Sequence, residues 1–133
     1  MKVVDYHLQE AFDKQGLDLT KEQMVVLKTL YGQDGINQNE LAGLTFRDKS
    51  SLARLLSKME SKNYIIKVQS EEDKRNNEIF ITVKGAAIFE RTRPIIQDII
   101  DTMEYGIDEQ HKTMMISNLK KIQHNFKTKL VSK

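Results

Sequence analysis

Hydrophobic residues recur at the spacing of an amphipathic helix in two stretches near the start of the chain. Residues 2–15 and 20–32 are these stretches, and a glycine that can end a helix closes each of them, at Gly16 and Gly32. Thr20, with Gln23 three residues later, has the pattern of a capping box. The residues expected to face inward are Val4, Leu8, Ala11 and Phe12 in the first helix and Met24, Leu27, Leu30 and Tyr31 in the second.

Two further helices follow, joined by a short loop. Residues 37–43 predict a very short helix that Asn37 can cap, with Leu41 and Ala42 facing inward. The stretch 48–65 predicts a longer helix with Asp48 as its cap. Its apolar side chains cluster within about 100° of arc, and they are Leu52, Leu55, Leu56 and Met59. Two helices joined by a tight turn form a helix-turn-helix.

From Tyr64 the pattern changes to that of β-strands. The runs YIIKVQ (64–69) and EIFITV (78–83) are β-branched and aromatic, and the polar segment SEEDKRNN (70–77) separates them. This predicts a β-hairpin directly behind the helix-turn-helix. Helical spacing returns after Thr82 and continues to Met103, before Gly106. Pro94 lacks a backbone N–H, so we expect it to kink this helix or divide it near residue 93.

The last stretch, residues 108–131, predicts a helix capped by Asp108. Its narrow apolar stripe suits packing against other helices, and the stripe consists of Met115, Leu119, Ile122, Phe126 and Leu130. The chain has no internal repeat, low-complexity tract or disordered linker, so we expect one domain over residues 1–133. The predicted fold class is mainly α with a small β-hairpin.

The exposed face of the helix that begins at Asp48 lacks acidic residues altogether. It carries Ser50, Arg54, Ser57, Lys58 and Ser61. An ordinary solvated helix would favour Glu–Lys pairs and stronger helix formers than serine. Small residues allow close approach, hydroxyl groups bond phosphates or bases, and arginine can make two hydrogen bonds to guanine in the major groove. This face therefore fits DNA, with a serine-rich solvated helix as the alternative.

Charge is distributed unevenly along a chain whose net charge is only +2. Residues 45–84 carry +3 and residues 108–133 carry +4, whereas residues 1–44 carry −3 and residues 85–107 carry −2. A nonspecific polycation is excluded, so any basic function is local. In the hairpin tip we expect Asp73 to restrain Arg75 while Arg75 reaches a narrow groove of DNA. A solvated turn with unrelated charges is the alternative for the tip alone.

These patterns give a set of candidate DNA contacts. Arg54 is the expected base reader and Lys58 the expected phosphate contact, and Lys49 and Arg47 either contact phosphates or are solvated. Backbone N–H groups at the start of the short helix could meet a phosphate. The candidates are Asn37, Gln38, Lys49, Ser50, Ser51, Arg54, Lys58, Lys74 and Arg75, with Asp73 as the residue that orders the hairpin tip.

Other functional classes lack their characteristic residues. The chain has no nucleophile elbow and no Gly-rich phosphate loop, so we expect neither a catalytic site nor a cofactor. His7, His111 and His124 lack metal-ligand spacing, and no cysteine is present for disulfides or thiol sensing. No apolar run approaches a membrane span, and charges fall within the first ten residues, so we expect a cytoplasmic protein without membrane contact.

Four stretches together resemble the MarR family of winged helix-turn-helix transcriptional regulators. They are QMVVLKTL (23–30), NQNELAGL (37–44), DKSSLARLLSKMESKNYI (48–65) and EEDKRNNEIFITVKG (71–85). The match includes the Asp-x-Arg of the family's wing, at Asp73 and Arg75, and a Thr-x-x-Gly closure from Thr82 to Gly85. Asn63 stands where family members often have glycine, and asparagine tolerates the left-handed conformation.

The resemblance implies a winged helix-turn-helix lobe over residues 20–84, flanked by dimerisation helices at 1–16 and 85–133. It implies a homodimer that binds a pseudo-palindromic operator in double-stranded DNA, most simply as a repressor. It also implies a small aromatic or other effector, for which Met24, Met103, Met114, Met115 and Phe126 could line a pocket or simply pack in the core. A winged-helix module that binds another protein through the serine-rich face is the alternative function.

Overall fold

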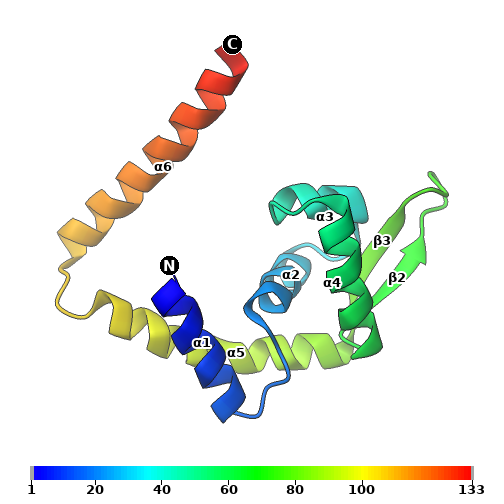
Figure 1. Ribbon diagram of the computed structural model, residues 1–133, viewed down its shortest axis with the longest axis horizontal. Coiled ribbons are helices and arrows are strands. Elements are labelled where there is room, and N and C mark those ends of the chain that lie inside the picture. Colours follow the sequence, from blue (N-terminus) through cyan, green and yellow to red (C-terminus); the bar gives the residue numbers. More distant parts are fainter. Residues whose placement is uncertain (1, 133) are drawn as a thin grey trace. The chain divides into compact units, whose positions relative to one another are not determined.

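The structure, a computed structural model, describes residues 2–132, with side chains up to Thr128. Its elements run in the order α1 (Lys2–Lys14), α2 (Lys21–Gly32), β1 (Ile36–Asn37), α3 (Gln38–Leu44), α4 (Lys49–Ser61), β2 (Ile65–Gln69), β3 (Asn77–Ile81), α5 (Val83–Glu104) and α6 (Glu109–Ser132). The strands β2 and β3 project beside the helices as a wing (Figure 1). The mainly α fold with a small β wing is therefore confirmed. The chain divides into two compact units, residues 1–99 and 100–133.

The sheet contains one strand more than the predicted hairpin. Its order is β1-β3-β2, and both pairs are antiparallel. Ile36 of β1 pairs with Ile79, while Ile65 of β2 pairs with Ile81. The strand β1 is only two residues long, too short to show an alternating pattern in the sequence. Its second residue, Asn37, also caps α3 as predicted, since its Oδ1 accepts from the backbone N–H of Asn39 at 2.8 Å.

The predicted helix starts are confirmed in detail. Thr20 Oγ1 accepts from the backbone N–H of Gln23, and the Gln23 side chain accepts from the backbone N–H of Thr20, both at 3.2 Å. Asp48 accepts from the backbone N–H of Ser51 at 2.7 Å, and Asp108 accepts from that of His111 at 2.8 Å. Each cap satisfies an N–H group that has no partner within its helix.

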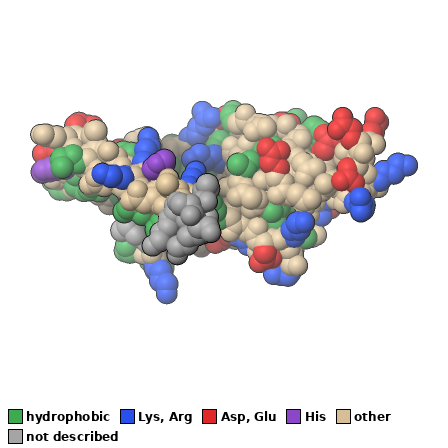
Figure 2. All heavy atoms as spheres, turned by 90° about the horizontal axis from the view of Figure 1, so that it is seen from above, with side chains coloured by type: hydrophobic (Ala, Val, Ile, Leu, Met, Phe, Trp, Pro, Cys, Tyr) green, Lys and Arg blue, Asp and Glu red, His purple; other side chains and the backbone are tan. Residues whose placement is uncertain are grey.

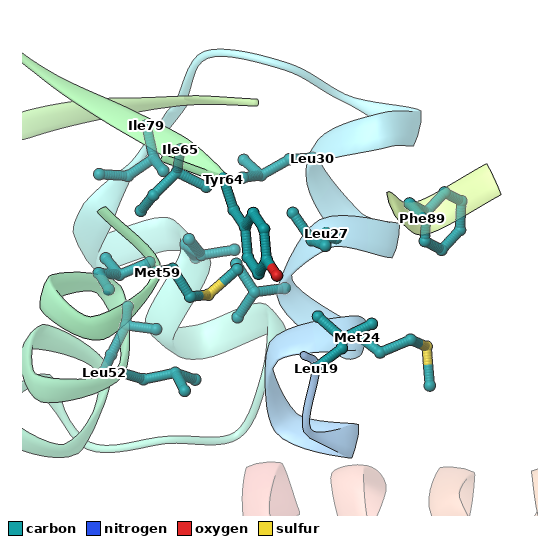
Figure 3. Close-up of a cluster of buried hydrophobic side chains, with 14 of the residues drawn as sticks. Leu19, Met24, Leu27, Leu30, Leu52, Met59, Tyr64, Ile65, Ile79 and Phe89 are labelled. Carbon is teal, nitrogen blue, oxygen red and sulfur yellow. The ribbon is translucent and has the colours of Figure 1, made fainter. Parts of the chain in front are cut away.

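The core of residues 1–99 forms where α2, α4 and the sheet meet (Figure 3). Fully buried side chains from three elements meet there, including Leu27 of α2, Met59 of α4 and Ile79 of β3. The predicted stripe of α4 is buried throughout. Tyr31 is a correction, because it is exposed rather than inward-facing. Its ring packs against Phe89 and its hydroxyl donates to Glu90, so α2 contacts α5 through an exposed side chain.

The helix α5 is not divided at Pro94. It runs from Val83 to Glu104 as one helix with the proline inside it. Pro94 cannot donate to the carbonyl of Glu90, which removes one helical hydrogen bond. Phe89 and Thr92 before the proline, and Ile95 after it, are all buried. Packing on both sides of the proline thus holds the helix together despite the missing bond.

The second unit consists of the end of α5 and the helix α6. Lys112 pairs with Glu104 at 3.1 Å within this unit, and the hydrogen bonds that Lys112 donates to Glu109 and Glu104 raise its pKa. The predicted stripe residues Met115, Leu119, Ile122 and Phe126 are exposed, between 51% and 64%. The side chain of Leu130, the last member of the stripe, lies outside the described residues. Over the described residues, no helix has the length and apolar character needed to span a membrane.

Candidate nucleic-acid interface

The helix α4 presents one apolar and one polar face. Leu52, Leu56 and Met59 are fully buried, and this fixes the rotation of the helix about its axis. The opposite face then points to solvent, and it exposes Ser50, Arg54, Ser57, Lys58 and Ser61. The sequence predicted this face, and the burial of the stripe confirms its exposure.

The basic side chains of α4 are unpaired. Among the described residues, the side chains of Lys49, Ser50, Arg54 and Lys58 make no hydrogen bond or ion pair. Arg54 and Lys58 are four residues apart and repel each other, which costs the helix about 0.2–0.5 kcal/mol. The helix therefore keeps three cations and the Ser50 hydroxyl free to bind an external anion. Ser57 differs, because its hydroxyl lies 3.5 Å from Nζ of Lys67 on β2.

The C-terminal end of α4 is fixed by contacts with the loop that follows α1. Asn63 has φ +64°, the left-handed conformation expected there, and the backbone N–H of Tyr64 donates back to the carbonyl of Met59. The Tyr64 hydroxyl donates to the carbonyl of Asp18 at 2.6 Å, and Lys62 pairs with the Asp18 carboxylate at 2.9 Å. Burial raises the pKa of the Tyr64 hydroxyl. Nothing in the local sequence pattern pointed to Asp18 as a partner.

The Thr-x-x-Gly segment closes the wing onto α4. The Thr82 hydroxyl donates to the carbonyl of Asn63 at 2.6 Å and accepts from the backbone N–H of Gly85 at 2.9 Å. A Cβ atom on Gly85 would lie only 2.2 Å from the carbonyl oxygen of Tyr64. Threonine is thus needed for its hydroxyl group, and glycine for the close approach of the two backbones.

The wing tip is an ordered turn around Asp73. Its Oδ1 accepts from the backbone N–H of Arg75 at 3.1 Å, and its backbone carbonyl accepts from the N–H of Asn76 at 2.9 Å. Arg75 Nε lies 3.8 Å from the same carboxylate, and the Arg75 side chain is 96% exposed. Acidic and basic side chains gather together over this end of the molecule (Figure 2). The turn therefore holds the backbone of Arg75 while its side chain projects into solvent.

The start of α3 supplies the remaining candidates. The side-chain oxygen of Asn37 is occupied as the helix cap, and that of Gln38 accepts from Nδ2 of Asn77 at 3.4 Å. The bond from Asn77 ties the start of α3 to the wing. Since α3, α4 and the wing lie next to one another at one end of this unit (Figure 1), all of the sequence-predicted candidates belong to a single region.

The residues considered for an effector pocket differ in their burial. Met24 is buried in the core of residues 1–99, whereas Met103, Met114, Met115 and Phe126 are about half exposed. Two surface hollows, one beside the wing and one at the start of α2, are lined by other residues. In the part of the chain that the structure describes, no cluster of histidine and acidic residues could hold a metal ion.

The helix-turn-helix, the three-stranded sheet and the basic face of α4 together define a winged helix-turn-helix domain. The family model described as the MarR family matches residues 19–76. The chain is 31% identical to the transcriptional regulator SarZ of Staphylococcus aureus over 110 residues, which covers 82% of this chain and 73% of SarZ. The chain therefore belongs to the MarR family of winged helix-turn-helix transcriptional regulators.

Two solved structures of similar proteins contain DNA. One is a mutant MarR from E. coli complexed with operator DNA, with a TM-score of 0.84 and 25% identity over 91% of this chain and 86% of that one. The other is a complex of MepR from S. aureus with DNA, also with a TM-score of 0.84 and 25% identity, over 93% of this chain and 90% of that one.

Proposed function

We propose that this protein binds operator DNA sequence-specifically and regulates transcription from the neighbouring promoter. The observation that carries the proposal is the face of α4, where Arg54 and Lys58 have no partner among the described residues and no carboxylate lies between them. Phosphates and guanine edges are the ligands that suit such a face. The similarity to two proteins solved with DNA supports this reading.

Each candidate residue has a role in this proposal. Arg54 reads a base in the major groove, and Ser50, Ser51, Lys49 and Lys58 contact phosphates or base edges from the same helix. The tip residues Lys74 and Arg75 reach an adjacent minor groove, where negative potential is concentrated. Asn37 and Gln38 place the backbone N–H groups of α3 near a phosphate, and Asp73 orders the tip.

We further propose that the protein acts as a homodimer and that it represses transcription by covering a promoter. The exposed apolar stripe of α6 supports the dimer, since monomeric soluble proteins rarely expose a large apolar patch to water. Two copies related by a twofold axis would read a pseudo-palindrome whose half-sites lie about 34 Å apart.

A small-molecule effector would release the operator only under one condition. It must bind one spacing of the two α4 helices more tightly than the other, because equal affinity for both shifts no equilibrium. The effector is proposed from the family resemblance, and no residue is assigned to it.

The first experiment is an anisotropy titration of labelled DNA from upstream of this protein's own gene, with a scrambled duplex of equal length as the control. We expect the native fragment to bind at least about 10³-fold more tightly near physiological salt. The logarithm of affinity should fall with the logarithm of salt concentration by roughly 0.9 per phosphate contact.

The salt dependence separates this proposal from the alternative of a protein-binding module. A protein interface at the α4 face would give equal, weak binding of the two duplexes, and its affinity for the partner protein would fall much less steeply with salt. Equal binding of both duplexes, repeated with other upstream fragments, would contradict sequence-specific recognition.

A further inference from the structure

The sheet has a second face that points away from the core. Side chains alternate along a strand, so Ile65 and Ile79 face the core while their neighbours face outward. In the register of β2 and β3, Ile66 lies opposite Phe80 and Val68 lies opposite Glu78 on this outward face. Ile66 and Val68 are 49% and 44% exposed. A strip of apolar side chains therefore faces solvent on the outside of the wing.

A hollow of about 530 Å³ adjoins this strip at Val68. It lies between the start of α3 and the wing, and we call it the wing hollow. Four carboxylates line it, one from α3, two from the wing tip and one from β3: Glu40, Glu71, Glu72 and Glu78. No lysine or arginine belongs to its lining. The wing hollow is thus an acidic site with an apolar edge.

The four carboxylates have no partners of their own. Among the described residues none of them accepts a hydrogen bond or forms an ion pair, in contrast to Asp18, Glu60 and Glu104. Of the two cations in the wing tip, Arg75 pairs with Asp73, and Lys74 forms no ion pair with any of the four glutamates among the described residues. Like charges gathered around a hollow repel one another and concentrate a negative potential in it. A positively charged ligand would relieve this repulsion.

DNA and anionic effectors do not fit the wing hollow, because both carry the same sign of charge as its lining. A ligand that also covers the outward strip must carry apolar side chains, spaced to match those of the strands β2 and β3. We propose that the wing hollow and the outward strip bind an extended, cationic segment of a partner protein, in which basic and apolar residues occupy every second position and so share one face. The basic residues pair with the glutamates, and the apolar ones cover Ile66, Val68 and Phe80.

The test uses the full chain without DNA and a labelled peptide of about ten residues in which lysine and valine take turns at every second position, with serine between them, so that both point to the same side of the extended chain. Binding is followed by fluorescence anisotropy. We expect the peptide to bind, and a peptide with glutamine in place of lysine to bind at least about tenfold more weakly. Because no DNA is present, this result does not depend on the proposed regulatory function.

Two triple variants with equal changes in charge locate the site. The site variant is Glu71→Gln, Glu72→Gln and Glu78→Gln, and the control variant is Glu10→Gln, Asp13→Asn and Glu22→Gln on α1 and α2. We expect the site variant to lose at least about tenfold in peptide affinity and the control less than about twofold. Equal losses in the two variants would show only long-range attraction and would overturn the proposal.

The apolar strip is tested separately with Val68→Thr and Ile66→Thr, which keep β-branched side chains at exposed strand positions. Each should weaken peptide binding by about threefold or more, since each removes part of the apolar contact. Unchanged binding in both variants would contradict a role for the strip. A second copy of this chain could also occupy the site, and sedimentation of the site variant without peptide tests this. A change in the oligomeric state of the variant would identify the second copy as the ligand and would overturn the proposal.

Discussion

Arg54 and Lys58 lie on the same face of α4, but their removal should affect DNA binding in different ways. Arg54→Ala should cost about 1–3 kcal/mol of operator affinity and relax specificity at one base pair, because a guanine contact is lost. Lys58→Ala should weaken all DNA sequences alike and reduce the salt slope by about one phosphate contact. Anisotropy titrations of the operator and of single-base variants of it measure both effects.

Lys14→Ala is the control for these two variants, since it removes one positive charge from α1, where Lys14 pairs with Glu10 and no candidate DNA contact lies. It should leave operator affinity within about twofold of the native protein, because exposed charges are screened over about 8–10 Å. If Arg54→Ala lowered affinity equally for the operator and for every base variant, Arg54 would be a phosphate contact and not a base reader.

Gly85 illustrates how one missing side chain sets the position of a whole element. A Cβ atom there would lie 2.2 Å from the Tyr64 carbonyl oxygen, so Gly85→Ala must push α5 away from the start of β2. We expect a loss of about 1–3 kcal/mol or more in the free energy of unfolding, measured by urea denaturation. Gly43→Ala is the matched control. It lies in α3 with nothing within 4 Å of the added atom, and it should be neutral or stabilising by up to about 1 kcal/mol. Equal stability of the two variants would contradict the tight contact at Gly85.

At the level of the element, Asp73 has two opposing effects on the wing tip: its negative charge opposes DNA binding, and its hydrogen bonds order the turn. Asp73 lies beside Arg75, so removing its negative charge alone would strengthen DNA binding. We expect the opposite for Asp73→Ala, a loss of about threefold to tenfold in operator affinity, because the N–H of Arg75 loses its acceptor and the turn loosens. Asp73→Asn keeps an oxygen acceptor while removing the charge, and it should bind at least as tightly as the native protein. Tighter binding by Asp73→Ala would mean that the carboxylate acts only through its charge.

The elements differ in how far their own sequence determines them. The stripe and cap of α4 could be predicted because period and capping are local properties, and the exposure of Arg54 follows from the same stripe. The strand β1 could not be predicted, because two residues are too few to show an alternating pattern. The strand forms through its pairing with β3. The persistence of α5 through Pro94 depends on side chains buried around it, which local rules for proline do not include.

The candidate site likewise has features that can be predicted from the sequence and features that cannot. Which side chains α4 exposes follows from sequence, and their contacts with DNA stay a prediction. The partners that hold α4 in place are distant in sequence, since Lys62 contacts Asp18 over 44 residues of separation. The wing hollow also escapes a sequence reading, because Glu40 and Glu78 belong to separate elements that only the fold brings together.

At the scale of the whole molecule, the exposed stripe of α6 is the feature that supports the proposed dimer. Met115, Leu119, Ile122 and Phe126 recur at spacings of four, three and four residues and are all more than half exposed. Each such side chain contributes about 1.5–3 kcal/mol when it is fully buried. Helices with this spacing bury it against another helix, which for two identical chains gives a twofold interface.

The dimer prediction can be tested by placing one charge in this stripe. Leu119→Glu should shift the protein from dimer to monomer in sedimentation experiments, because a carboxylate would have to be buried without a partner. Operator affinity should fall by about 10²-fold or more, since the second half-site would no longer be held at a high effective concentration. Lys121→Gln changes the net charge equally, lies away from the stripe on α6, and should remain dimeric. A monomeric native protein, or a Leu119→Glu variant that stays dimeric and binds the operator normally, would show that the copies associate elsewhere or not at all.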